Sequence, residues 1–248
     1  MHRGSIPGGI AGRLLVIVAA AACLRGADAR EGTKARVKER ATAVYPYDLA
    51  LRGVEGTADL QFNVDPEGQA QDVIVAQATD PAFGFAAKAM LEAWRFEPVT
   101  ERGDAVWVRN QSLRVTFESA SADVALDASA RQLLAELKKD KPAIASAAAL
   151  DGVPWATKTE PPVYPRDLMK GRDIAGKATI DFLVDETGRA QLPRIVSSSQ
   201  WEFGWAAATA ILRFKFTPPT KGGVPAATRL RLPVVFSAPP PPKAGGAP

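Results

Sequence analysis

One stretch decides how this chain folds, and it occurs twice. The first occurrence is Gly56-Thr-Ala-Asp-Leu-Gln-Phe-Asn-Val-Asp-Pro-Glu-Gly-Gln-Ala70. Its counterpart is Gly176-Lys-Ala-Thr-Ile-Asp-Phe-Leu-Val-Asp-Glu-Thr-Gly-Arg-Ala190, with seven identities in fifteen positions. Apolar residues alternate with other residues along the first nine positions, which predicts a strand with one buried face. The aspartate and the glycine three positions later favour a tight turn, so the residues that follow are predicted to return as the second strand of a hairpin.

The similarity extends to both sides of the hairpin. Tyr45-Pro46 recurs as Tyr164-Pro165, and residues 83–98 share six identities in sixteen positions with residues 203–218. The separation stays at 119 or 120 residues throughout. Because chance does not keep register over that length, we infer a tandem duplication, with copy one at residues 43–119 and copy two at residues 160–237.

Each copy is predicted to contain a short helix, a hairpin, a longer helix and a last strand. Pro46 suits the first turn of the short helix, and Gly53 suits its end. Pro98 is expected to close the longer helix of copy one, whose apolar face consists of Phe85, Ala86, Ala89, Met90, Ala93 and Trp94. The fold class is therefore α+β, with two tandem units that each hold a three-stranded antiparallel sheet, a packed helix and a short N-terminal helix.

The N-terminal segment differs from the rest of the chain. Residues 1–29 combine basic residues, a short apolar run and the small-x-small pattern Ala27-Asp28-Ala29, which predicts a cleaved secretory signal peptide. Lipidation at Cys23 is one alternative, and retention of the segment as a membrane anchor is another. Residues 30–42 are predicted to form a basic leader that extends into solvent as an arm.

Two further segments lie outside the copies. Residues 120–159 contain leucines at helical spacing, which predicts a helical linker packed on one or both domains. Residues 238–248 include the run Pro239 to Pro242 and are predicted to be a disordered tail. Trp201 has no apolar counterpart in copy one, so its indole could be exposed and available for binding.

Composition argues against several functions. The net charge of +4 in 248 residues is mild and forms no basic patch, so no nucleic-acid partner is expected. Cleavage after Ala29 would leave no cysteine and no histidine, which removes thiol nucleophiles, imidazole bases and the usual zinc and copper ligands. Asp65 and its counterpart Asp185 lie in hairpin turns, where aspartate serves turn geometry. We expect no enzymatic activity, no metal and no cofactor.

The ordered motifs resemble the TonB C-terminal domain. Copy one carries Tyr45-Pro46, Val54-Glu55-Gly56, the strand and turn of residues 62–68 and Trp94-Arg95-Phe96-Glu97-Pro98 in the order and spacing of that domain. Copy two is looser and has Phe214-Lys215-Phe216-Thr217-Pro218 in place of the last motif. The resemblance implies a non-catalytic periplasmic module of a Gram-negative bacterium, linked to TonB-dependent transmembrane transport.

The resemblance also implies a binding mode. In that family the domain adds the N-terminal segment of an outer-membrane transporter as a strand to its sheet. By analogy the binding edge is the last strand of copy one, with Gln111, Leu113, Arg114, Val115, Thr116 and Phe117 as partner-binding residues. Proline at Val115 is expected to abolish binding and to leave the fold largely intact. Copy two is expected to bind less well, because Pro233 removes a backbone donor from its last strand.

The expected partner is an extended peptide of an outer-membrane transporter or another envelope protein. Membrane contact is expected only through an uncleaved or lipidated N-terminus. In an alternative hypothesis the protein is an envelope scaffold without a peptide ligand, whose two domains pair edge to edge or which forms a homodimer. In a third, a retained N-terminal anchor makes the protein a short energy transducer.

Overall fold

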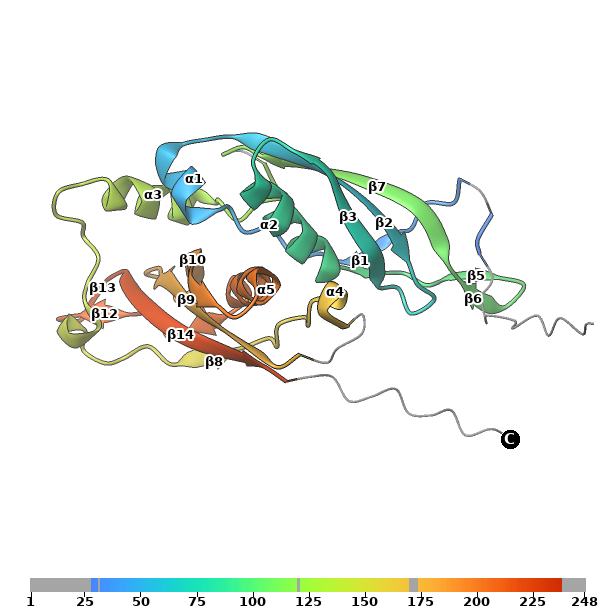
Figure 1. The fold of residues 1–248 in the computed structure, drawn as a ribbon. Coiled ribbons are helices and arrows are strands. Elements are labelled where there is room, and N and C mark those ends of the chain that lie inside the picture. The colour runs from blue at the N-terminus through green and yellow to red at the C-terminus, as the bar shows by residue number, and fades with distance from the viewer. Residues whose placement is uncertain (1–27, 31, 120, 170–173, 238–248) are drawn as a thin grey trace, which may run out of the picture.

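A computed structural model describes residues 28–30, 32–119, 121–169 and 174–237. Two separate three-stranded antiparallel sheets form the outer layers, and the two long helices lie between them (Figure 1). The predicted α+β fold with two tandem units is confirmed. Most of the predicted signal peptide, Cys23 and the predicted tail lie outside the described residues.

Copy one begins with α1 (Tyr47–Arg52), which follows Pro46 and ends at Gly53 in the left-handed conformation, with φ at 67°. The hairpin and the long helix come next: β2 (Gly56–Val64), β3 (Ala70–Ala78) and α2 (Pro81–Glu92). The remaining strands are β4 (Arg95–Phe96), β5 (Val99–Glu101), β6 (Asp104–Val106) and β7 (Val108–Phe117). The strand order β3-β2-β7 places β7 at an edge of the sheet.

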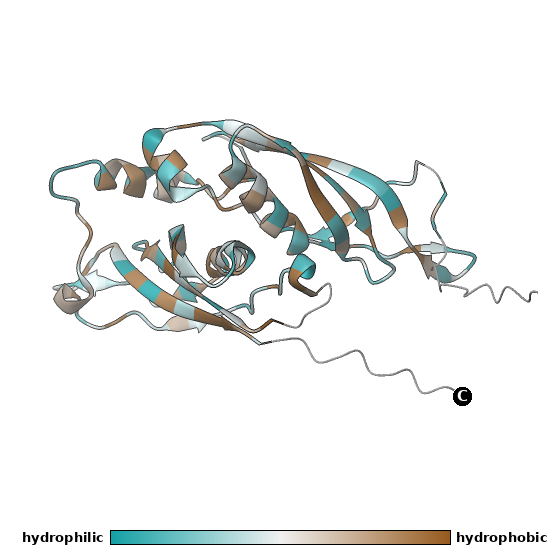
Figure 2. Cartoon of the chain, in the orientation of Figure 1, coloured by the Kyte–Doolittle hydropathy of each residue, from teal (hydrophilic) through white to brown (hydrophobic). Residues whose placement is uncertain are grey.

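Copy two repeats this order. Its elements are α4 (Arg166–Met169), β9 (Gly176–Val184), β10 (Ala190–Ser198), α5 (Trp201–Ile211), β11 (Lys215–Phe216), β12 (Thr220–Lys221), β13 (Val224–Pro225) and β14 (Thr228–Phe236). The sheet order β10-β9-β14 makes β14 the counterpart of β7. Hydrophobic and hydrophilic residues alternate along β14, as expected for a strand that covers a core on one face (Figure 2).

Between the copies the chain forms α3 (Ala128–Leu137), η1 (Ala147–Ala149) and β8 (Ala156–Lys158). The carboxylate of Asp127 accepts the Ala130 N–H at 2.9 Å and caps the start of α3. Leu133 and Leu134 are buried in a core cluster that also contains Leu183 of copy two. The predicted helix in this segment therefore packs against both copies.

The Tyr-Pro motif occurs at the same place in both copies because its tyrosine belongs to an aromatic core that both copies share. The Tyr45 ring meets the rings of Phe83 and Phe117 edge to face, each at a centroid distance of 5.8 Å. Its hydroxyl donates to the Val54 carbonyl at 2.8 Å, so the one polar atom of the ring is satisfied. In copy two, Tyr164 meets the Phe203 ring in the same way, at 5.4 Å.

Two predictions about local structure are wrong. The long helix ends at Glu92 and not at Pro98, because the N–H of Phe96 donates to the Gly68 carbonyl at 2.8 Å and β4 pairs with β1 (Val37–Glu39). Since β1 comes from the leader, that segment is not a solvated arm. These pairings join residues far apart in sequence, so the local pattern could not reveal them.

The copies pack through their helices. Phe85, which was predicted on the core face of the long helix, instead stacks on Trp201 of α5 at a centroid distance of 4.2 Å. Trp205 packs against the cores of both copies. The two sheets stay separate, so the edge-to-edge pairing expected under the scaffold hypothesis is wrong.

The hairpin turn generates a test of the fold. Gly68 has φ at 77°, and a Cβ there would lie 2.2 Å from the Phe96 carbonyl oxygen, which β4 holds in place. Gly68→Ala is expected to lower the free energy of unfolding by roughly 2–4 kcal/mol, from left-handed strain plus the clash. Gly53→Ala is the matched control, because Gly53 has φ at 67° but open space around it. It is expected to cost about 1 kcal/mol. Urea denaturation followed by tryptophan fluorescence measures both, and equal losses would contradict the close packing of β4 on the turn.

Candidate functional site: an open sheet edge

The direction of each backbone group of β7 follows from its partner β2. Thr57 of β2 donates its N–H to Thr79 Oγ1 at 3.0 Å, and its carbonyl accepts the Thr79 N–H at 3.0 Å. Both groups of Thr57 therefore point away from β7. In an antiparallel pair, residues directly opposite each other either exchange hydrogen bonds or both point away from each other. Thr116, which lies opposite Thr57, consequently directs its N–H and C=O to the open edge.

The same alternation assigns the other residues of the strand. Ser112 and Arg114 also face outward, whereas Leu113 and Val115 bond to β2. Among the described residues, no backbone hydrogen bond joins residues 112–116 to a strand other than β2. A row of outward N–H and C=O groups is a template for an added strand.

The side chains of the predicted binding residues have different surroundings. Val115 and Phe117 are fully buried in the core of copy one, so their side chains are unavailable to a partner. The Gln111 side chain holds the leader, because its Oε1 accepts the Ala35 N–H and its Nε2 donates to the Thr33 carbonyl, both at 3.1 Å. The structure therefore gathers these residues on one strand but leaves only some of them exposed.

Arg114 is exposed on the opposite face of the sheet from the core. Its guanidinium donates to both carboxylate oxygens of Asp59, at 2.6 and 2.7 Å. These hydrogen bonds hold the pKa of Asp59 below its usual value. The bidentate pair links the edge strand to β2 from its solvent side.

The direction of the Val115 backbone N–H corrects the expectation about proline at this position. Its N–H points to Ala58 of β2, so proline at this position would remove a hydrogen bond inside the sheet. The expectation that Val115→Pro leaves the fold intact is therefore wrong. Sequence alone could not decide this, because alternation shows which side chains are buried but not which backbone groups face a neighbour.

The edge of copy two is different. Lys177 bonds to Ser199 as Thr57 bonds to Thr79, so Pro233, which lies opposite Thr179, has its ring nitrogen at the open edge. This proline corresponds to Arg114 in copy one and removes a donor there. One end of β14 is also covered, because Ala145 of the linker donates its N–H to the Ala227 carbonyl at 2.8 Å.

The described parts of the chain offer little else that resembles a reactive centre. No group of three or more His, Cys, Asp or Glu residues within those ranges could hold a metal ion. None of the helices described is long and apolar enough to cross a membrane.

Comparison with known proteins gives the family. A model described as the C-terminal region of the Gram-negative bacterial TonB protein matches residues 41–119 and again residues 160–238. The chain belongs to the TonB C-terminal family. It is also similar to the solution NMR structure of the Pseudomonas aeruginosa TonB C-terminal domain, with 21% identity over 37% of this chain and 92% of that chain, at a TM-score of 0.31. No curated protein matches the chain.

The two TonB C-terminal units share a charged contact. Lys88 of α2 forms an ion pair with Asp167 of α4 and donates to the Val73 carbonyl at 3.0 Å. Arg166, the neighbour of Asp167, donates to the Gln69 side chain. In copy two the position of Lys88 is an alanine, so this cluster breaks the symmetry of the duplication.

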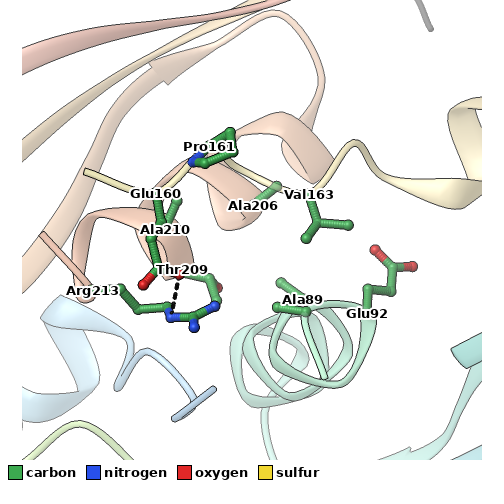
Figure 3. A pocket seen from close by; sticks show the side chains of 10 residues that line it. Ala89, Glu92, Glu160, Pro161, Val163, Ala206, Thr209, Ala210 and Arg213 are labelled. Atoms are coloured by element: carbon green, nitrogen blue, oxygen red, sulfur yellow. Dashed lines mark ion pairs between the residues drawn. The ribbon is translucent and has the colours of Figure 1, made fainter. Parts of the chain in front are cut away.

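Glu92, one helical turn after Lys88, is buried where the units meet. Figure 3 shows a small hollow between the units, lined by Ala89 and Glu92 of α2 on one side and by Thr209 and Ala210 of α5 on the other. Burial raises the pKa of Glu92 to about 7, although Lys88 opposes the shift. This carboxyl group is therefore uncharged in mildly acidic solution.

The buried carboxyl group predicts a pH dependence of stability. The pKa of Glu92 rises from 4.5 to about 7 on folding, because the folded chain favours the protonated carboxyl group. The contribution of this proton to the free energy of unfolding is fully present below pH 4.5 and is lost as the pH rises through 7. A shift of that size corresponds to roughly 3 kcal/mol. Glu92→Gln is expected to be about 2–3 kcal/mol more stable than the native chain at pH 8 and equal to it at pH 4.5.

Urea denaturation across that pH range measures the effect. Glu186→Gln is the control, because Glu186 is exposed in a hairpin turn and this variant removes a carboxylate without changing the buried contact between the units. If the stability of the native chain and that of Glu92→Gln change in parallel with pH, the pKa of Glu92 does not change on folding.

Proposed function

We propose that this protein is a non-catalytic periplasmic binding protein that holds an extended peptide as a fourth strand along β7. The peptide would come from an outer-membrane transporter or another envelope protein, which links the protein to TonB-dependent transport. The observation that carries the proposal is the row of outward backbone groups of Ser112, Arg114 and Thr116 in a unit of the TonB C-terminal family.

The geometry limits the strength of such binding. Three outward residues offer up to six backbone hydrogen bonds, each worth a net of about 0.5–1.5 kcal/mol. Ordering an extended peptide opposes part of that gain. Backbone pairing is also independent of sequence, so the exposed side chains of Ser112 and Arg114 and the half-buried side chain of Thr116 would have to select the peptide.

The two units would have unequal roles. Pro233 removes a donor from the β14 edge, and the linker covers one end of it. Copy two would therefore support copy one through the contact between α2 and α5 and would not bind a peptide itself. The proposal implies one peptide per chain.

The direction of the backbone groups defines the test. Arg114→Pro copies the natural proline of copy two into copy one and removes one outward donor without breaking a backbone hydrogen bond to β2. The side-chain pair with Asp59 is lost in this variant and in its control alike. Arg114→Pro is expected to keep the native circular dichroism spectrum and to weaken peptide binding at least tenfold. Arg114→Ala is the matched control, since it removes the same side chain but keeps the N–H, and it should bind the peptide at least threefold more tightly than Arg114→Pro does.

The measurement has two steps. The native chain, as it is exported by the cell, serves as bait in a pull-down from an envelope extract. Isothermal titration calorimetry then measures the affinity of each variant for the peptide of the captured protein. Identical partners and affinities for Arg114→Pro and Arg114→Ala would reject strand addition. If Arg114→Pro instead dissociates a homodimer, with no peptide partner captured, the edge joins two chains and the scaffold hypothesis holds.

A further inference from the structure

A second exposed surface lies on copy two, at the end of the molecule where η1, β12 and β13 meet (Figure 1). Val153 and Trp155 of the linker are 69% and 65% exposed, and Val224 of the β12–β13 hairpin is 63% exposed. An isolated exposed valine is ordinary, but a tryptophan that exposes two thirds of its area is not. Val153 and Trp155 lie two positions apart on one segment, and hydrogen bonds from Gly222 and Gly223 to Asp151 hold that segment beside the hairpin that carries Val224. Exposed apolar side chains on adjoining segments indicate a contact with another body.

The linker holds these side chains in place. Residues 151–158 run antiparallel to residues 215–221, with the Trp155 N–H donating to Thr217 Oγ1 at 3.2 Å and the Thr217 N–H donating to the Trp155 carbonyl at 3.0 Å. The Asp151 carboxylate accepts the N–H groups of Gly222 and Gly223 at 2.7 and 2.8 Å. The exposure therefore belongs to an ordered ribbon, and docking would cost little conformational entropy.

The rim of this ribbon is basic. Lys158 of β8 lies directly opposite Lys215 of β11, and Lys221 is exposed at the hairpin. Like charges opposite each other destabilise a sheet, so their presence calls for a compensating anion. The nearby carboxylates do not supply it in full, because Asp151 is taken up by backbone N–H groups and Glu160 is shared between Lys158, at 3.0 Å, and Arg213, at 2.8 Å.

We propose that Val153, Trp155 and Val224, with Lys158, Lys215 and Lys221 around them, form a docking surface for a bilayer with anionic phospholipid headgroups. Tryptophan and short aliphatic side chains insert at the level of the headgroups, while lysines attract the lipid phosphates. The surface would add a membrane contact on copy two, whereas the sequence suggested membrane contact only through the N-terminal segment.

Other occupants fit less well. A second copy on this surface would gather two sets of three lysines in one two-fold interface, where their like charges repel. A protein partner would need a pocket for Trp155, but a fluid bilayer accepts a protruding side chain without a matching shape. Docking at this end leaves β7 free, because the β5–β6 hairpin that precedes β7 lies at the other end of the molecule (Figure 1).

Co-sedimentation with vesicles tests the proposal on the chain as exported by the cell. Vesicles of phosphatidylglycerol and phosphatidylethanolamine are compared with vesicles of phosphatidylcholine alone. The native chain is expected to bind the anionic vesicles at least tenfold more strongly, and 0.5 M salt should abolish the difference. Trp155→Ser is expected to reduce binding to the anionic vesicles about tenfold.

A matched pair of valines supplies the control. Val153→Ser removes a 69% exposed valine from the surface, and Val235→Ser removes a 73% exposed valine from β14. Only Val153→Ser should weaken vesicle binding, by about threefold. A lipid-modified or uncleaved N-terminus would bind vesicles in every variant alike, so equal binding by all variants overturns the proposal. Absence of vesicle binding, or self-association that depends on Trp155, overturns it as well.

Discussion

The contact between α2 and α5 is the interaction on which the rest of the structure depends. A three-stranded sheet with one helix covers only one of its faces, and that helix still exposes its outer side. In the duplicated chain the outer side of α2 packs against the outer side of α5, so each helix covers the surface that the other would expose. The rings of Phe85 and Trp201 are in contact, and Trp205 packs against both cores. Both sheets consequently face outward, and their edges do not meet.

This arrangement lets the two copies diverge. Lys88 of α2 pairs with Asp167 of the other copy, and Glu92 is buried one turn further on. Their counterparts in copy two are Ala208 of α5 and Leu212, the residue directly after α5. Residues at the outer edges have diverged separately, as Pro233 opposite Thr179 shows. One copy keeps a complete row of outward donors and acceptors, and the other lacks one donor. The asymmetry suits a chain in which one unit binds and the other supports it.

Much of each unit could be predicted from the sequence, because the signals are local. Alternating apolar residues in 56–64 predict β2, Gly68 requires a positive φ in its turn, and Gly53 ends α1 for the same reason. Long-range pairing was not predictable from such patterns. The leader strand β1 pairs with β4 across more than fifty residues, and that pairing ends α2 early. The local composition of β1 and that of β4 do not indicate that these two segments pair.

The sequence by itself determined the duplication and the class of the fold, since each depends on a repeat or on short-range periodicity, whereas the last strand of copy one was expected as the binding edge from the resemblance to the TonB family. Only the tertiary structure decided which residues of that edge face outward. Backbone direction alternates with the same period of two as side-chain burial, but its phase is set by the neighbouring strand. Tertiary packing likewise decided the burial of Glu92 and the exposure of Trp155, because both depend on what another segment of the chain covers.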